Sequence, residues 1–308
     1  MMGFWGVVVR GYAMGVAELV PGISGGTIAF ISGLYTPLLA SLSAFDGQLL
    51  ALLRRGAFRE AFAHVQGAFL LTLVLGMGLA IVSLAALLKA LLATHGMLLW
   101  AFFFGLILAS AVHVALSVGR WGALEGASAL LGTILGAWLS TAGALSLGEG
   151  PGALFFGGAL AVCAWILPGV SGSFLLLVLG LYDRVLHALS NFVLADLLAL
   201  AMGCGLGLLL FVRLLKRLLQ TAEGPTLAAL GGFMFGALQM LWPWQMVKAY
   251  QLGREGSARV ILSEPLGPAG YARFYGEDPK LWTVAALMCL GVAVVWMLAR
   301  GRGDGPIS

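Results

Sequence analysis

Charged residues are scarce in this sequence. Asp, Glu, Lys and Arg make up 10% of its 308 residues, while 61% are hydrophobic. A soluble domain usually contains about 25% charged residues. One large core cannot absorb so large a deficit, because protein surface grows too steeply with mass. The composition therefore excludes an ordinary soluble domain, and we expect the apolar surface to face lipid.

Cysteines are few, and alternation of polar with apolar residues is missing from the apolar segments. The three cysteines, Cys163, Cys204 and Cys289, lack the spacing of a metal site or a disulfide framework. The apolar segments run for about 20 residues, the length of a membrane-spanning helix. Backbone groups in lipid need internal partners, which leaves helices or a closed barrel. The sequence therefore predicts an all-α polytopic membrane protein.

Apolar segments of helix length follow one another along the chain. A polar, basic connection at 46–63 and a polar stretch at 247–279 interrupt them. We expect a single membrane domain over residues 1–308. Its apolar helices should cover residues 4–20, 26–44, 66–92, 97–118, 124–145, 153–167, 173–190, 194–215, 226–246 and 281–299.

The sequence also repeats itself. Residues 18–45 (ELVPGISGGTIAFISGLYTPLLASLSAF) align without gaps on residues 165–192 (WILPGVSGSFLLLVLGLYDRVLHALSNF). Two further pairs follow in the same order, namely stretches that begin at Gly76 and Gly203 and Phe-rich stretches that end at Gly105 and Gly236. Three matches in register indicate a duplicated unit. We expect repeat A at about 1–120, a connecting span at about 124–145, repeat B at about 150–246, an outward loop at 247–280 and a final span at 281–299.

The number of crossings predicts that the second copy is inverted. Residues 4–44 should enter and leave on one side, whether as two spans or as a re-entrant hairpin. The three spans at 66–92, 97–118 and 124–145 then precede the second unit. An odd number of crossings inverts that unit, and inverted repeats place a site near the midplane at their interface.

The basic residues predict the orientation in the membrane. On the side of the N-terminus lie Arg10, Arg54, Arg55, Arg59, Arg120, Arg213, Lys216, Arg217, Arg300 and Arg302, whereas the short loops of the other side hold Lys89 and Arg184. Arg and Lys concentrate in short cytoplasmic loops. We therefore expect a multi-pass protein of the cytoplasmic membrane with both termini in the cytoplasm. Because these basic residues flank spans, we expect no nucleic-acid partner.

Two Pro-Gly-x-Ser-Gly motifs are the most informative feature. Pro21-Gly22 and Pro168-Gly169 interrupt apolar sequence and break a helix there. Non-helical backbone at membrane depth is tolerated where it is buried in protein or lines a watery cavity. New helices begin after each break, and helix N-termini suit phosphate groups. The expected phosphate-binding residues are Ser24, Gly25, Gly26, Thr27, Ser171, Gly172 and Ser173. The alternative is that both motifs are packing kinks that bring helices close together.

Glu18 is an ionisable residue inside an apolar segment, where a functional role is the default interpretation. The second copy has Trp165 in its place, so the pseudo-symmetry breaks there. A carboxylate beside an anion site suits coupling or gating, with protons or sodium as the coupling ion. Arg10 either attracts the anion or pairs with Glu18 in a structural role. We expect no cofactor and no metal site, and signatures of catalysis are missing from the sequence.

Three ordered stretches carry a resemblance to a known family. They are Glu18–Thr27 (ELVPGISGGT), Leu167–Ser173 (LPGVSGS) with Gly180–Tyr182 (GLY), and Phe235–Trp244 (FGALQMLWPW). In these the chain resembles the bacterial and archaeal polyprenyl-phosphate transporter family, long described as a domain of unknown function. Two departures are Glu18, where the family usually has Asp, and Leu106–Ala111, where a Gly-Ser pair is commoner. Neither departure removes a motif.

The resemblance implies a function. A member of this family returns undecaprenyl phosphate, the carrier lipid of cell-wall synthesis, across the cytoplasmic membrane. The expected partners are a polyprenyl-phosphate lipid and the surrounding membrane lipids. Two alternatives remain open: a channel or secondary transporter for a small anion, and an integral-membrane lipid phosphatase or transferase. A lateral opening wide enough for an isoprenoid would favour the polyprenyl-phosphate transporter over the small-anion channel, and release of inorganic phosphate would favour the phosphatase or transferase.

Overall fold

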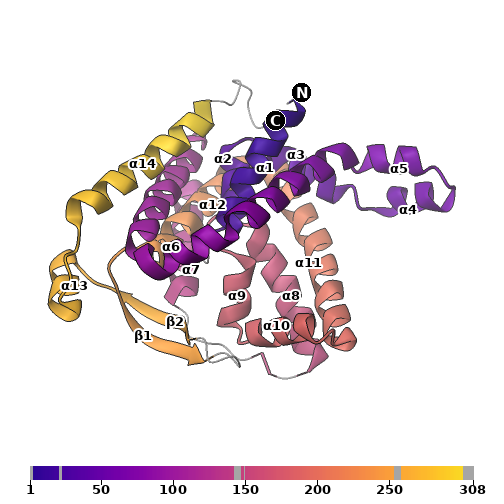
Figure 1. The fold of residues 1–308 in the computed structure, drawn as a ribbon. Coiled ribbons are helices and arrows are strands. Elements are labelled where there is room, and N and C mark those ends of the chain that lie inside the picture. Colours follow the sequence, from indigo (N-terminus) through magenta and orange to yellow (C-terminus); the bar gives the residue numbers. More distant parts are fainter. Residues whose placement is uncertain (1–2, 21–22, 142–146, 149, 253–257, 301–308) are drawn as a thin grey trace.

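The computed structural model describes residues 3–20, 23–141, 147–148, 150–252 and 258–300, with the backbone alone for 249–252 and 258–262. Helices dominate this part of the chain (Figure 1). The first half contains α1 (Phe4–Glu18), α2 (Gly25–Ile31), α3 (Tyr35–Ser43), α4 (Gly47–Arg54), α5 (Phe58–His64) and α6 (Gly67–Leu116). Next come α7 (Ala123–Thr141), α8 (Pro151–Ile166), α9 (Gly172–Val178), α10 (Tyr182–Ser190), α11 (Leu194–Thr221) and α12 (Glu223–Ala237). The chain continues with a 3-10 turn η1 (Leu238–Leu241), strands β1 (Gln245–Leu252) and β2 (Ala258–Pro265), and helices α13 (Pro268–Tyr275) and α14 (Leu281–Arg300).

Several of these helices are long and apolar enough to cross a membrane, which confirms the polytopic helical class. Among the described residues, 5 helices meet this test: α6, α7, α11, α12 together with η1, and α14. The pairs α2–α3 and α9–α10 are bent by 116° and 110°, and counting each bent pair as one span gives up to 7. Figure 1 shows α1 beginning and α14 ending toward the same side, with β1 and β2 toward the opposite side.

The helices expected at 26–44 and 173–190 are each broken into two. After α2, Gly33 adopts φ +77° and its amide donates to the Phe30 carbonyl, while the Leu34 amide donates to Ala29. This pair of bonds is a Schellman motif, which ends a helix at a left-handed glycine. The second copy ends α9 in the same way at Gly180, with φ +69°. Gly33 and Gly180 therefore end helices at positions where continuous helices were expected.

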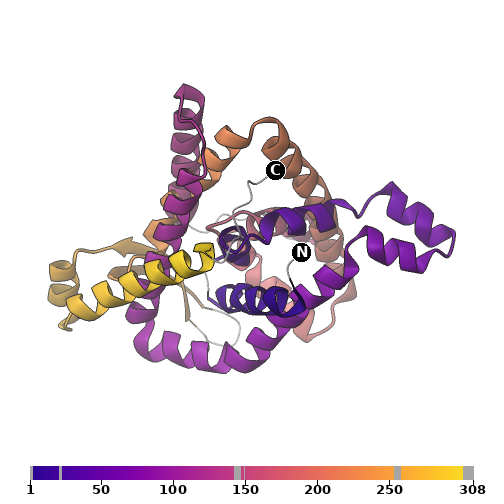
Figure 2. The same ribbon diagram turned by 90° about the horizontal axis from the view of Figure 1, so that it is seen from above.

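The spans expected at 66–92 and 97–118 are two helical segments of α6 that meet at a kink. α6 has 50 residues and departs from helical geometry at His95 (φ −136°, ψ 33°). At 1.5 Å per residue, the segments before and after His95 are about 42 Å and about 31 Å long, so each is long enough to cross a hydrocarbon core. Figure 2 shows α6 curving around one side of the molecule. The two spans therefore meet at a bend and not at a loop.

Two polar connections contain more structure than their composition suggests. The basic connection at 46–63 forms α4 and α5, a helical arm that extends away from the rest of the molecule (Figures 1 and 2). The polar stretch at 247–279 contains the antiparallel hairpin β1–β2, in which Gln245 pairs with Pro265, and the short helix α13. The expected helix at 226–246 is too long, because η1 ends it before Pro243, which has no N–H for a helix.

Glycines set the packing of the first helix pair in each half. A side chain at Gly76 of α6 would strike the Val8 carbonyl of α1, and one at Gly203 of α11 would strike the Phe155 carbonyl of α8. Gly11 and Gly158 make the reciprocal close approaches, to the Leu73 and Leu200 carbonyls. One of the repeat matches pairs Gly76 with Gly203. The alignment of residues 18–45 on 165–192, extended upstream without gaps, pairs Gly11 with Gly158. The pairs α1–α6 and α8–α11 therefore pack at matching residues.

The second pair of helices in each half matches in the same way. Gly105 of α6 lies against Met288 of α14, and Gly236 of α12 lies against Thr133 of α7. The reciprocal approaches are those of Gly291 to Phe102 and of Gly136 to Phe233. In the chain, α7 follows α6 but packs along α12, while α14 follows α12 but packs along α6. The helices α7 and α14 thus occupy equivalent places and are exchanged between the halves. How the halves are oriented in a membrane stays a prediction, as do the repeat boundaries.

Candidate functional site

The first motif begins α2, and the protein itself occupies its first amides. The Gly25 amide donates to Glu18 Oε1 at 2.7 Å, and the Gly26 amide donates to Ser24 Oγ at 3.0 Å. All seven residues of α2 are buried, as are Ser24 and the end of the preceding break. The Glu18 carboxylate therefore sits where we expected a phosphate oxygen, on a helix-start amide that favours negative charge.

Close packing around Gly25 fixes the position of Glu18. A Cβ atom at Gly25 would lie 2.7 Å from Glu18 Oε1, so any larger residue would displace the carboxylate. The Trp165 side chain also lies beside Glu18. These two residues are aligned with each other in the sequence repeat, so the break in pseudo-symmetry is a direct contact between the two copies. Glu18 and Trp165 are both half-buried.

The two motifs touch each other directly. The Gly169 amide donates to Thr27 Oγ1 at 2.9 Å, and Ser24 Oγ donates to the Trp165 carbonyl at 2.8 Å. Tyr35, at the start of α3, donates from its hydroxyl to the Ile166 carbonyl at 3.2 Å. The last carbonyls of a helix have no partner within it, so polar side chains of the first unit satisfy the end of α8. The structure thus brings the two breaks into one buried polar contact.

The second motif has a simpler start. Ser171 caps α9, since its Oγ accepts from the Phe174 amide at 3.2 Å, and it lies 3.2 Å from Ser173 Oγ. Gly169 has φ +103°, a conformation that favours glycine, and packs against Met234 of α12. A Cβ atom at Gly172 would lie 2.5 Å from the Ala161 carbonyl. Ser171 is buried, whereas Ser173 is exposed.

The remaining residues of the expected site divide into three groups. Pro168 is buried and follows the extended Leu167, which ends α8. Pro21 and Gly22 lie outside the described residues. Arg10 lies on α1 about two turns before Glu18, and the pairing of these two residues stays a prediction. Within the described part of the chain, no three His, Cys, Asp or Glu side chains are grouped so that they could hold a metal ion.

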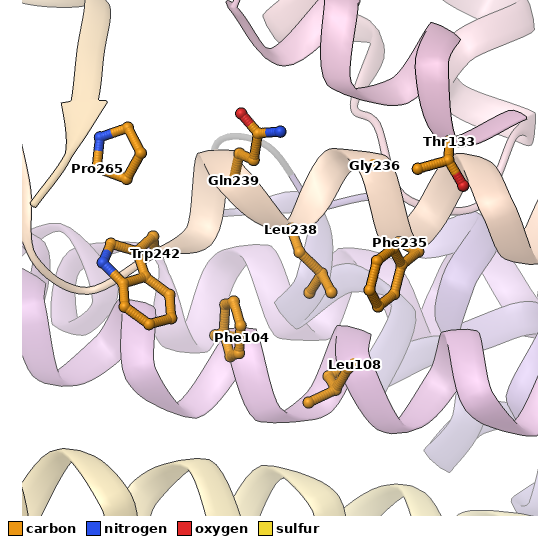
Figure 3. Close-up of a pocket in the computed structure, with 9 residues that line it drawn as sticks. All are labelled: Phe104, Leu108, Thr133, Phe235, Gly236, Leu238, Gln239, Trp242 and Pro265. Carbon is orange, nitrogen blue, oxygen red and sulfur yellow. The ribbon is translucent and has the colours of Figure 1, made fainter. Parts of the chain in front are cut away.

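A second feature is a groove between α6 and α12 (Figure 3), which sequence reasoning missed. Its volume is about 400 Å³, within the range of ligand pockets. Its lining consists of Phe104, Leu108, Thr133, Phe235, Gly236, Leu238, Gln239, Trp242 and Pro265. We call this the α6–α12 groove. The matching Phe-rich stretches before Gly105 and Gly236 were the signal in the sequence, and their ends form opposite walls.

The matches with known proteins are all described as transporters or translocases of polyprenyl phosphates. Residues 14–259 match a family model described as VCA0040-like, undecaprenyl phosphate translocase-like. A polyprenyl-phosphate transporter of Vibrio cholerae is 37% identical over 300 residues, which is 97% of each chain. A polyprenyl-phosphate transporter of Staphylococcus aureus is 31% identical over 263 residues, 78% of this chain and 86% of that one. No solved structure matches.

Proposed function

Because the chain belongs to this family of undecaprenyl phosphate translocase-like proteins, we propose that it moves undecaprenyl phosphate or a related polyprenyl phosphate across the cytoplasmic membrane. The transfer returns the carrier lipid to the cytoplasmic leaflet, with both termini of the protein in the cytoplasm. The family is named for transport, which favours a carrier over an enzyme. The names of the two relatives support the same class of substrate.

The contact between the two motifs is the observation that carries this proposal. The Gly169 amide and Thr27 Oγ1 join the breaks of the two halves at 2.9 Å, so one headgroup can reach both. The phosphate is held by Ser24 to Thr27 on one side and by Ser171 to Ser173 on the other. The polyprenyl tail stays in lipid, so the protein need only lower the free energy of carrying a charged headgroup through hydrocarbon.

Glu18 gives this site a means of coupling. Its carboxylate and the phosphate compete for the same Gly25 amide, and two negative charges so close in a low dielectric repel strongly. Arrival of the phosphate therefore displaces Glu18, which takes up a proton. Release of that proton on the cytoplasmic side couples transport to the proton gradient. Rocking of one half against the other then exposes the headgroup to each side in turn.

The test is a binding and transport assay with purified protein in liposomes. Undecaprenyl phosphate should stabilise the protein against heat, whereas its neutral alcohol and chloride should not. Fluorescent or isotopically labelled lipid should then cross the bilayer, with no inorganic phosphate released. Equal stabilisation by chloride would instead favour an anion channel, and phosphate release would favour an enzyme.

The proposed orientation has its own test. In a cysteine-free background, a cysteine at Arg55 in the arm should react with a membrane-impermeant thiol reagent from the cytoplasmic side. A cysteine at Glu277, beyond α13, should react from the other side. Both positions are exposed in the structure. Labelling of both from one side would contradict the assignment.

A further inference from the structure

The α6–α12 groove lies at the interface between the two halves. The alignment that pairs Gly105 with Gly236 also pairs Phe104 with Phe235 and Leu108 with Gln239. All four of these residues line the groove (Figure 3). Its two walls are therefore equivalent segments of the repeat, and sites in transporters with internal repeats form at such an interface.

The chemistry of the lining suits hydrocarbon and not a headgroup. Aromatic and aliphatic side chains dominate it, and none of the lining residues is charged. Thr133 Oγ1 donates to the Ala129 carbonyl, and Trp242 Nε1 donates to the Leu266 carbonyl, both at 2.8 Å. These two polar groups are satisfied within the chain, which leaves the exposed Gln239 as the remaining polar side chain of the lining. The groove also reaches the surface, since Phe235 is 55% exposed, so a chain can enter from the surrounding lipid.

Helix α12 connects this groove to the second motif. Met234 packs against Gly169, where a Cβ atom would lie 3.0 Å from Met234 Cα. The next two residues, Phe235 and Gly236, line the groove. The same helix therefore supports a motif on one face and a wall of the groove on another. A ligand that fills the groove therefore contacts α12, the helix that packs against Gly169.

We propose that the α6–α12 groove holds a segment of the hydrocarbon chain of the transported lipid while its phosphate is at the motifs. This assignment rests on the proposed function, because it places the tail of that substrate. The shared chemistry is that of any flexible lipid chain, so an isoprenoid must be distinguished from the acyl chain of a phospholipid. The walls that Phe104 and Phe235 form then make the protein selective for tail as well as headgroup.

Photo-crosslinking identifies the occupant. A photoreactive phenylalanine analogue replaces Phe104 or Phe235, in protein held in phospholipid bilayers with undecaprenyl phosphate. The matched control carries it at Leu131, which is 61% exposed on α7 and does not line the groove. We expect mass spectrometry to find polyprenyl phosphate attached at both groove positions and not at the control. Phospholipid alone at the groove positions, or equal capture at Leu131, would overturn the assignment.

A blocking variant separates this inference from the proposed function. Leu108→Trp fills the groove, whereas Leu131→Trp adds the same bulk on the lipid-facing side. Leu108→Trp should weaken the apparent affinity for undecaprenyl phosphate by about tenfold, with no change for isopentenyl phosphate, whose tail is too short to need the groove. Unchanged affinity for the long lipid would remove the groove from the mechanism. If wild-type protein fails to transport the lipid at all, it is the proposed function that fails.

Discussion

The two bent hairpins share a sequence motif but differ in their surroundings. In the first, every residue of α2 is buried, and the α2 start is held by Glu18 as well as by Ser24. In the second, only Gly172, Phe174 and Val178 of α9 are buried, and the serine Ser171 alone provides the cap. The second hairpin has fewer contacts to lose when it moves. We therefore expect the first hairpin to be the fixed, charge-bearing side of the site and the second to be the side that opens.

The connections after the two hairpins differ as well. α10 leads within a few residues into α11, whereas the arm formed by α4 and α5 separates α3 from α6. The end of α3 is held from the other half, since Arg213 donates to the Phe45 carbonyl at 2.8 Å and Lys216 to Ser43 Oγ at 3.0 Å. Positive groups near the C-terminal end of a helix stabilise it. The first hairpin is thus fixed at both ends by residues of the second half.

The largest effect should come from breaking the packing that both halves share. Gly76→Leu and Gly203→Leu place a side chain against the backbone of α1 and α8. Each should destabilise the protein by about 3 kcal/mol or more, as overpacking between helices does. Yield of monodisperse protein and the thermal midpoint measure this. The controls Gly78→Leu and Gly205→Leu lie two residues along the same helices, with open space around them, and should be tolerated. Equal loss in the controls would mean that close approach is not the cause.

Glu18→Gln removes the charge that distinguishes the first hairpin. The glutamine oxygen can still accept from the Gly25 amide, so the fold and lipid binding should persist. Transport in liposomes should lose its dependence on the pH gradient, because the residue can no longer exchange a proton. The control is Glu125→Gln, since Glu125 likewise accepts from a glycine amide, that of Gly122 at 3.0 Å, outside the site. Unchanged pH dependence in Glu18→Gln would leave this residue a structural role only.

The two capping serines sharpen the comparison on a smaller scale. Ser24→Ala loses the cap of α2 and the bond to the Trp165 carbonyl, so we expect a loss of about 2 kcal/mol. Ser171→Ala loses the cap of α9, and about 1 kcal/mol is expected. Thermal unfolding in detergent measures which of the two variants loses more stability, with Ser140→Ala on α7 as a control. A larger loss of stability in Ser171→Ala than in Ser24→Ala would contradict the closer packing of the first hairpin.

Ser171→Leu, which covers the amides, should abolish binding of the lipid.

The smallest effect concerns the arm. Asp46 caps α4, and the Leu49 amide, followed by the side chain of His64, holds the pKa of Asp46 below its ordinary value. A carboxyl group whose pKa is lowered by folding stabilises the fold above its unfolded pKa, and this contribution is lost as pH falls below about 4. The protection factors of the Gln48 and Leu49 amides, which are corrected for the intrinsic exchange rate at each pH, should therefore fall on acidification. Asp46→Asn keeps a capping oxygen but cannot titrate, so its exchange should lack this acid-dependent step.

The sequence predicted the helical membrane class of the fold, whereas the bends within it depend on contacts that the sequence does not show. Hydrophobic length was enough to predict membrane helices. The expected spans at 66–92 and 97–118 placed a break around His95, but a kink could not be told from a short loop, because both have the same apolar pattern. The bends at Gly33 and Gly180 were missed because a single glycine is compatible with helix until the Schellman bonds around it are seen.

The candidate site was predictable in its residues but not in its contacts. Repetition of the motifs placed Ser24, Thr27 and Gly169 among the functional candidates. The bond between Thr27 and Gly169, and that between Glu18 and Gly25, depend on how two distant segments meet. Local sequence does not contain that information. The phosphate-binding role of these residues stays a prediction.

The exchange of α7 and α14 has a consequence for how the protein is made. The ribosome releases α6 early, yet α14, which packs against its Gly105 face, is synthesised only after α12 and the β1–β2 hairpin. α7 emerges directly after α6 and must wait for α12, the helix against which it packs. Insertion of the first half into the membrane therefore leaves an open glycine-lined surface until α14 is synthesised. A chain cut short before α14 would present that surface to the proteases and chaperones that survey unfinished membrane proteins.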